Sequence, residues 1–223
     1  MKPSSDFDHQ AAFASRLLAL TLPACAALAV ALHTLAPLAL MGPPALTLLV
    51  HRLRRFAAAS VLPNLLTALR VMLTAALALY VRELWLQAAL VVLVFVIDGL
   101  DGLLARRLHA TSAQGAHFDM EADGYFVLVV CALLTERVGA WVLLGGLLRY
   151  AFVLATWLVP SRGEAPRSQL ARYAFAASLA GYVSALLVPA PLAPWAALLG
   201  TLVLVASFGR SFWWSFRPEL YET

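Results

Sequence analysis

The chain has 223 residues, of which 62% are hydrophobic and 13% are charged, and its mean hydropathy is +0.83. Because a soluble domain is usually about a quarter charged, this composition argues against a soluble protein and favours a single membrane domain. The net charge of +4 does not indicate nucleic acid binding, since the basic residues are spaced between apolar segments and are not clustered with aromatic side chains.

The first apolar stretch runs from Leu17 to Val50, and as one helix it would be about 50 Å long, too long for a single membrane crossing. Four residues that disfavour a helix interior interrupt it, namely Pro37, Gly42, Pro43 and Pro44. We therefore predict that the N-terminal extension, residues 1–59, contains a hairpin of two membrane helices. One long span followed by a re-entrant or interfacial piece remains the alternative.

Six further apolar segments of about 20 residues follow, which is the length that crosses a bilayer as a helix. They are Leu65–Val81, Leu84–Leu104, Ala116–Leu134, Ala140–Val159, Leu170–Leu187 and Ala193–Phe212. The sequence thus predicts an all-α integral membrane protein with a six-helix transmembrane core in residues 60–223 and the helical hairpin as an N-terminal extension.

The arginines predict how these helices are oriented. If the loop between the second and third core helices faces the cytoplasm, only Arg82 and Arg137 lie near the other side. On the cytoplasmic side would be Arg52, Arg54, Arg55, Arg106, Arg107, Arg162, Arg167, Arg172, Arg210 and Arg217. This asymmetry follows the positive-inside rule. We expect a multi-pass protein of a bacterial inner membrane, with anionic headgroups of the lipid bilayer as its nearest partners.

Four of the six aspartates lie within one stretch of 26 residues that has apolar flanks. They are Asp98, Asp101, Asp119 and Asp123. A carboxylate beside hydrocarbon costs roughly 2.5 to 3.5 kcal/mol, and four together also repel one another. Either their pKa values rise until several are neutral, or cations hold them together. The stretch itself offers only Arg106 and Arg107 as cationic side chains, so we expect divalent metal ions.

The spacing of the aspartates predicts two facing pairs. Asp98 and Asp101 are three residues apart near the end of one helix, and Asp119 and Asp123 are four apart at the start of the next, so each pair shares a helix face. Residues 107–116 can turn the chain back and bring the pairs together. Ligands that are all oxygen indicate Mg²⁺ or Mn²⁺, because no histidine or cysteine has the spacing of a zinc site.

Carboxylates beside an arginine predict phosphoryl transfer at this end of the bundle. The planar guanidinium of Arg106 suits a phosphate, and two metal ions can clamp a pyrophosphate and polarise the attacked phosphorus. A remaining carboxylate could accept the proton of an alcohol nucleophile.

The same stretch resembles the signature D-x2-D-G-x2-A-R-x8-G-x3-D-x3-D of the class I CDP-alcohol phosphotransferase family. It matches at every fixed position, through Asp98, Asp101, Gly102, Ala105, Arg106, Gly115, Asp119 and Asp123. Upstream, residues 63–70 read PNLLTALR and are similar to the P-N-x-L-T-x-x-R start of the family's first core helix. The resemblance covers about residues 60–213, which would be the catalytic domain.

The resemblance implies transfer of a phosphatidyl group from CDP-diacylglycerol to a polar alcohol, with release of CMP and with two Mg²⁺ or Mn²⁺ ions as cofactors. Asp98, Asp101 and Asp119 would be metal ligands, and Asp123 would be the general base while also touching a metal. The nucleotide site would contain Pro63, Asn64, Thr67, Gly102, Ala105, Arg106, Ser112 and Gly115. A homodimer is also expected from the family.

The acceptor is less defined by the sequence. Arg149 lies in the middle of an apolar span and could bind a phosphate on glycerol 3-phosphate or inositol phosphate, together with Arg167 and Arg172. Snorkelling or ion pairing would explain Arg149 equally well. The G-K-x-K-T-like stretch of glycerophosphate-using members is not evident in residues 162–172, so an alcohol without phosphate also stays open.

Three polar neighbours of the motif are expected to have no part in it. By helical phase Glu121 points away from the aspartates, and we expect it to meet solvent or headgroups. His109 and His117 are expected to be polar boundary residues. Two other classes of protein remain as alternatives, an intramembrane Mg-dependent prenyltransferase and a non-catalytic cation-binding membrane protein such as a transporter or scaffold.

Overall fold

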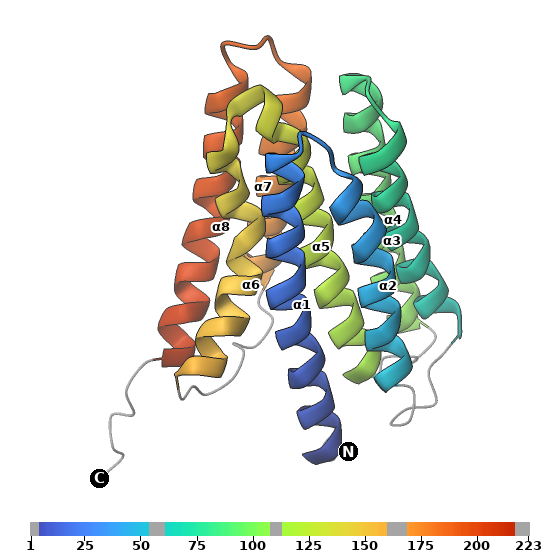
Figure 1. The fold of residues 1–223 in the computed structure, drawn as a ribbon. Helices are drawn as coiled ribbons and strands as arrows, with labels where there is room; N and C mark the ends of the chain where they lie inside the picture. The colour runs from blue at the N-terminus through green and yellow to red at the C-terminus, as the bar shows by residue number, and fades with distance from the viewer. Residues whose placement is uncertain (1–4, 54–60, 108–112, 160–168, 217–223) are drawn as a thin grey trace.

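The computed structural model describes residues 5–53, 61–107, 113–159 and 169–216, and in these ranges the chain is all-α, with helices and no strands (Figure 1). In chain order the elements are α1 (Ser5–Ala31), α2 (Ala36–Leu53), α3 (Val61–Tyr80), α4 (Leu84–Arg107), α5 (Ala113–Val138), the short 3₁₀ helix η2 (Ala140–Val142), α6 (Leu143–Leu158), α7 (Gln169–Leu187) and α8 (Ala193–Phe216). The all-α prediction is confirmed for these ranges, in which α3 to α8 follow the N-terminal pair.

Helices that follow one another in the chain pack together as antiparallel pairs. The pairs α1 and α2, α3 and α4, α5 and α6, and α7 and α8 are all in contact. Figure 1 shows that α1 begins and α8 ends at the same end of the bundle, where α4 also ends and α5 begins. The two predicted aspartate pairs therefore lie on helix ends that meet at one end of the molecule.

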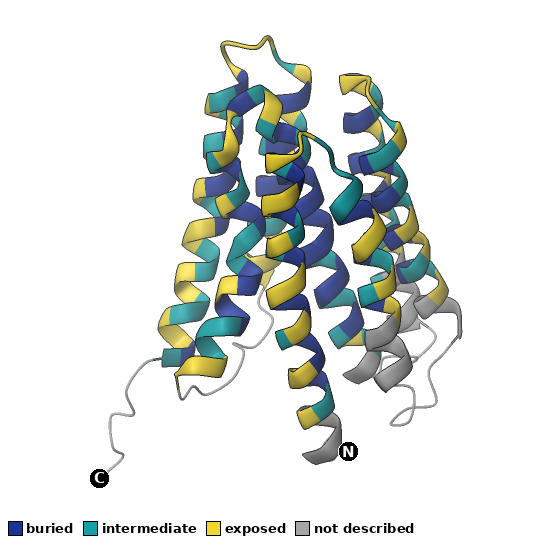
Figure 2. Ribbon diagram, viewed as in Figure 1, coloured by how far each residue is buried: buried dark blue, intermediate teal, exposed yellow. Residues whose placement is uncertain are grey.

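Helix α5 is the centre of the bundle. It contacts α1, α2, α3, α6, α7 and α8, and every residue from Gly124 to Ala132 is buried, which Figure 2 shows as a continuous dark stretch. A helix that is buried on all sides forms the core of a larger bundle. Side chains on opposite faces of α5 consequently meet different sets of helices, and this separates the two charged groups described below.

Four helices are long and apolar enough to cross a membrane among the residues that the structure describes. The spans are His9–Ala31, Ala140–Leu158, Gln169–Leu187 and Ala193–Phe216. Helices α3 and α4 contribute shorter apolar parts, Leu65–Tyr80 and Leu84–Leu100.

Exposed aromatic residues mark both ends of these spans. Trp195 and Trp213, 67% and 70% exposed, lie toward opposite ends of α8 and are 18 residues apart, a rise of about 27 Å along the helix. Trp85 is exposed near the start of α4, at the end of the bundle where Trp195 lies, and Tyr173 is exposed at the opposite end, near the start of α7. Tryptophan and tyrosine collect at the two interfaces of a bilayer about 30 Å thick, so this surface fits a multi-pass membrane protein.

The N-terminal hairpin is present, and its turn lies just before Pro37, the first of the four predicted interruptions. Residues 32–35 connect α1 to α2, whereas Gly42, Pro43 and Pro44 lie inside α2. His33 adopts a left-handed φ of 49°, and the Thr34 amide donates to the Ala29 carbonyl at 3.0 Å, which closes the end of α1. Pro37 in the first turn of α2 fits the start of a helix, whereas Gly42, Pro43 and Pro44 do not end one here.

Candidate active site

A single buried arginine connects three aspartates from two other helices. The Arg70 guanidinium on α3 contacts Asp98 of α4 at 2.5 Å and Asp119 of α5 at 2.8 Å. It also donates to Asp123 of α5. The Arg70 side chain is only 2% exposed, while the three carboxylates are 24% to 29% exposed. We call Asp98, Asp119 and Asp123 the aspartate cluster. The Arg70 guanidinium is buried behind its carboxylates, and their other side is accessible to solvent.

Each helix places its residue by simple periodicity. Asp119 and Asp123 are one turn apart on α5, and Thr67 and Arg70 are one turn apart on α3 and both buried. The Thr74 hydroxyl donates to the Arg70 carbonyl at 2.7 Å, so it is satisfied within its own helix. Three apolar helices thus bring an arginine and three carboxylates together at one place.

The donor set of the aspartate cluster fits a hard divalent cation. One oxygen from each carboxylate lies within 4.8 Å of the others, and carboxylate oxygens are the ligands that Mg²⁺ and Mn²⁺ prefer. Among the side chains that the structure describes, three carboxylates face one guanidinium, which leaves a formal excess of negative charge. The exposed side of the cluster is where a cation could offset that excess.

The remaining motif residues are only partly described by the structure. Asp101, Ala105 and Arg106 lie in α4 and Pro63 and Asn64 lie in α3, but their side chains are outside the described part of the molecule. Ser112 and Arg167 are outside the described residues altogether. Gly102 is one turn beyond Asp98 on α4, and Gly115 is one turn before Asp119 on α5, so both are near the cluster along their helices.

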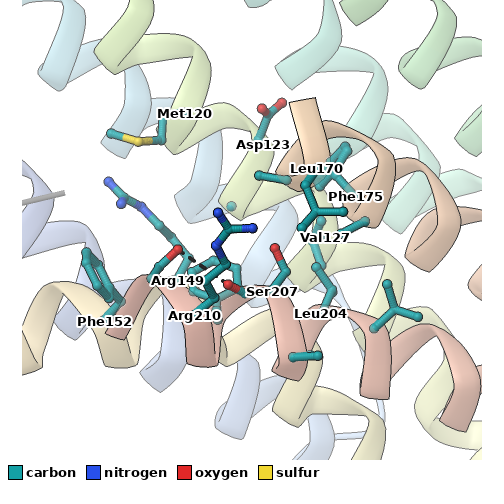
Figure 3. Close-up of a pocket in the computed structure, with 18 of the residues that line it drawn as sticks. Met120, Asp123, Val127, Arg149, Phe152, Leu170, Phe175, Leu204, Ser207 and Arg210 are labelled. Carbon is teal, nitrogen blue, oxygen red and sulfur yellow. Dashed lines mark hydrogen bonds between the residues drawn. The ribbon is translucent and has the colours of Figure 1, made fainter. Parts of the chain in front are cut away.

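A large pocket opens beside the aspartate cluster, between α5, α6, α7 and α8 (Figure 3). Its volume is about 810 Å³. Asp123 forms part of its wall, and Arg149 of α6 and Arg210 and Ser207 of α8 are its other labelled polar residues. Most of the lining is apolar, from side chains such as Val127 and Leu204. Asp123 is therefore shared between the cluster and the pocket.

Of the three predicted acceptor arginines, the structure brings only Arg149 into this pocket among those it describes. Arg172 is exposed on α7 and does not line the cavity. Arg149 also forms an ion pair, because its Nη2 donates to Glu121 Oε1 at 2.6 Å. The sequence had offered pocket lining and ion pairing as alternatives for Arg149, and the structure has both.

The expectation for Glu121 was wrong in part. Its side chain points away from the aspartate cluster, as helical phase predicts, but it is 1% exposed and meets neither solvent nor headgroups. Its partners are Arg149 and the Ser15 hydroxyl, which donates to Glu121 Oε1 at 2.7 Å. A buried carboxylate requires such partners. Helical periodicity predicted the direction of the Glu121 side chain, but it could not predict that side chains of α1 and α6 would cover it.

Three residues of these sites were missing from the predicted set. Arg70 was visible as the final residue of the PNLLTALR segment and as a lone cation in an apolar helix, which is a usable signal. Arg210 was counted only as an orientation signal. Ser15 had no signal, because nothing in the sequence places α1 against α5.

Comparisons with known proteins agree with the motif. The family model described as CDP-alcohol phosphatidyltransferase matches residues 60–208, about two thirds of the chain. The chain therefore belongs to this family, whose members are membrane transferases of phosphate-containing groups that use CDP-linked alcohols in phospholipid synthesis. No curated protein and no solved structure matches the chain.

Proposed function

We propose that this family member transfers a phosphatidyl group from CDP-diacylglycerol to a polar alcohol and releases CMP. The observation that carries the proposal is the position of Asp123, which belongs to the aspartate cluster and also lines the pocket that contains Arg149 and Arg210. A metal-binding group and an alcohol-binding pocket must meet at the reacting phosphorus. Asp123 is the described residue at which these two features of the chain meet.

The aspartate cluster, with Asp101 from the motif, would hold two Mg²⁺ or Mn²⁺ ions. Bound there, the ions would neutralise the diphosphate and polarise its phosphorus. The protein itself supplies Arg70, which is buried behind the carboxylates and offsets part of their mutual repulsion. On the family resemblance, the cytidine diphosphate would bind near α3, α4 and the start of α5. The residues that would contact it are Pro63, Asn64, Thr67, Gly102, Ala105, Arg106, Ser112 and Gly115.

The alcohol would bind in the pocket with its hydroxyl toward Asp123. Its oxygen attacks the phosphorus that bears diacylglycerol, the bond from that phosphorus to the CMP oxygen breaks, and the hydroxyl proton passes to the Asp123 carboxylate. Arg149, Arg210 and Ser207 can orient the polar part of the acceptor from the other walls. Two arginines favour an acceptor with an anionic group, such as glycerol 3-phosphate.

We place this site at the cytoplasmic face of a bacterial inner membrane, in a catalytic domain of residues 60–223 whose six helices all cross the bilayer. The arginine asymmetry supports this orientation. The N-terminal extension would be residues 1–59. A homodimer follows from the family resemblance, and light scattering of the purified protein would test it.

The proposal is tested by an acceptor panel. Detergent-solubilised protein with Mg²⁺ or Mn²⁺ and CDP-diacylglycerol is given glycerol 3-phosphate, inositol phosphate or uncharged alcohols, and CMP release and the mass of the lipid product are measured. We expect one acceptor to give both CMP and the corresponding phospholipid. Asp123→Asn should lower turnover by at least about 100-fold, because it removes the general base.

A matched control for this variant is Glu136→Gln, the same change of acid to amide at an exposed position near the other end of α5. Its turnover should stay within twofold of the wild type. Absence of CMP with every acceptor would refute the transferase proposal, and normal turnover in Asp123→Asn would refute the assignment of the base.

A further inference from the structure

The N-terminal hairpin lies outside the residues that match the family, yet it packs against the helices that form the site. Helix α1 contacts α5 and α6, which carry Asp123 and Arg149. Figure 1 shows α1 running beside both of these helices. Near the end of the bundle where α1 begins, the Arg16 guanidinium lies 5.3 Å from the centre of the Trp157 ring of α6. The hairpin is thus positioned to influence the pocket directly.

A chain of hydrogen bonds runs from α1 to the pocket through α5. The Ser15 hydroxyl donates to Glu121 Oε1 at 2.7 Å and lies 2.9 Å from His117 Nε2. Because a serine hydroxyl has a single hydrogen, its oxygen accepts from His117, whose hydrogen is then on Nε2. Glu121 Oε1 in turn accepts from Arg149 Nη2 at 2.6 Å. Four side chains from α1, α5 and α6 are therefore connected in one path, in which Ser15, Glu121 and Arg149 are buried and His117 is partly buried.

One carboxylate oxygen of Glu121 serves both neighbours. Ser15 and Arg149 both donate to Oε1, while Oε2 is buried without a hydrogen-bond partner among the described residues. The direction of this carboxylate therefore depends on the contacts at Oε1. Loss of the Ser15 donor would remove one of the two bonds that fix it.

The stem of Arg149 is confined as well. A Cβ atom added at Gly124 would lie 3.0 Å from Arg149 Cγ, so the arginine side chain passes close over the α5 backbone beside Asp123. With its stem against Gly124 and its Nη2 on Glu121, the guanidinium has few other positions available. The placement of its remaining donors in the pocket follows from these two restraints.

We propose that Ser15, through Glu121, is a positioning residue for Arg149 in the acceptor pocket, so that the N-terminal extension takes part in acceptor binding. This inference rests on the proposed function, because it assigns the pocket to the alcohol. It adds a role for a segment that the family match does not cover.

The test separates the affinity for the acceptor from the affinity for CDP-diacylglycerol. With the acceptor that the panel identifies, Ser15→Ala should raise the acceptor KM about fivefold to tenfold, the effect of weakening one hydrogen bond to a charged group. The KM for CDP-diacylglycerol and kcat should stay within twofold. Ser15→Thr keeps the hydroxyl and should restore most of the acceptor affinity.

Thr21→Val is the matched control on α1, because the Thr21 hydroxyl is exposed and donates only to the Leu17 carbonyl of its own helix. It should leave both KM values unchanged. In a Glu121→Gln background, Ser15→Ala should change the acceptor KM less than it does in the wild type, since residues that act through one another are not additive.

The outcomes distinguish the two proposals. A wild-type protein that releases no CMP with any acceptor overturns the proposed function and this inference with it. An active wild type whose acceptor KM is unchanged by Ser15→Ala overturns only the inference, as does a variant in which both KM values rise together. Lower thermal stability of Ser15→Ala with unchanged kinetics would give Ser15 a purely structural role and would also overturn the inference.

Discussion

The two faces of α5 carry two charged groups of opposite character. On one face, Asp119 and Asp123 join Asp98 around Arg70, so negative charge is in excess among the described side chains, and the carboxylates are about a quarter exposed. On the other face, Glu121 is paired one to one with Arg149 and both are buried. Both groups contain acids and an arginine within the same few turns of helix.

Charge balance and exposure distinguish a cluster that can bind cations from an ion pair whose charges are already matched. An excess of like charge is relieved by bound cations or by protonation, whereas in a balanced buried pair each charge already has its counterion. The first arrangement should therefore respond to metal ions, and the second should respond to the loss of either member. The substitutions below test this comparison from the largest expected effect to the smallest.

The largest effect is expected for Asp119→Asn. Loss of a carboxylate from the cluster should lower turnover by at least about 1,000-fold, since bound metal ions supply several kcal/mol of transition-state stabilisation. The unfolding temperature should be unchanged or higher, because one like charge is removed and the amide oxygen can still accept from Arg70. CMP release and thermal unfolding in detergent measure the two quantities. A strong loss of thermal stability would place this aspartate with the internal ion pairs.

Glu121→Gln, two residues further along the same helix, should behave in the opposite way. It leaves the buried Arg149 cation without its counterion, which should lower the free energy of unfolding by about 3 kcal/mol. This loss of stability is at the lower end of the range for breaking a buried ion pair, because the amide oxygen of the glutamine can still accept from Ser15. Thermal unfolding measures it. A variant as stable as the wild type would show that the pair contributes little to the fold.

Arg70→Met tests how far the arginine substitutes for metal ions. Without its guanidinium the three carboxylates repel one another, so the variant should unfold at a lower temperature in metal-free buffer. Mg²⁺ added at a hundredfold excess over its dissociation constant should raise the free energy of unfolding of the variant by about 2.7 kcal/mol. The same Mg²⁺ concentration should stabilise the wild type by less.

The control for this experiment is Arg137→Met, which removes a guanidinium that donates to the Ala185 and Val188 carbonyls far from the cluster. It should also destabilise the protein, but Mg²⁺ should not compensate for the loss. Equal responses to Mg²⁺ in the wild type and in Arg70→Met would remove the link between this arginine and a metal site.

The helical segments and the aspartates of the cluster could be predicted from local sequence, but the side chains that pair with them could not. Hydropathy predicted the helical segments, because an apolar run of about 20 residues has one stable form in lipid. Spacing alone predicted that Asp119 and Asp123 share a face. The family motif supplied the chemistry, and the family match confirms the resemblance.

The partners of these residues depend on which helices pack together, and the periodicity of one helix does not predict its neighbours. Arg70 meets the aspartates only because α3 packs on α4 and α5, and Glu121 is buried only because α1 covers it. Three of the four predicted interruptions of the N-terminal segment lie inside α2 for a related reason. Gly42 was interpreted as a helix break, but its lack of a side chain allows a close approach between helices.

That close approach gives the smallest predicted effect and tests how tightly the hairpin covers α5. A Cβ atom at Gly42 would lie 2.2 Å from the ring of Tyr125, which is fully buried and whose hydroxyl donates to the Leu38 carbonyl at 3.2 Å. Gly42→Ala should therefore destabilise the protein by about 1 to 3 kcal/mol, the usual cost of overpacking a filled core. Gly209→Ala on α8 is the matched control, because no atom lies within 4 Å of the added Cβ, and better helix propensity should make it neutral or slightly stabilising. If thermal unfolding finds the two variants equally stable, the hairpin packs loosely on α5, and the buried face of this helix is held mainly by α6.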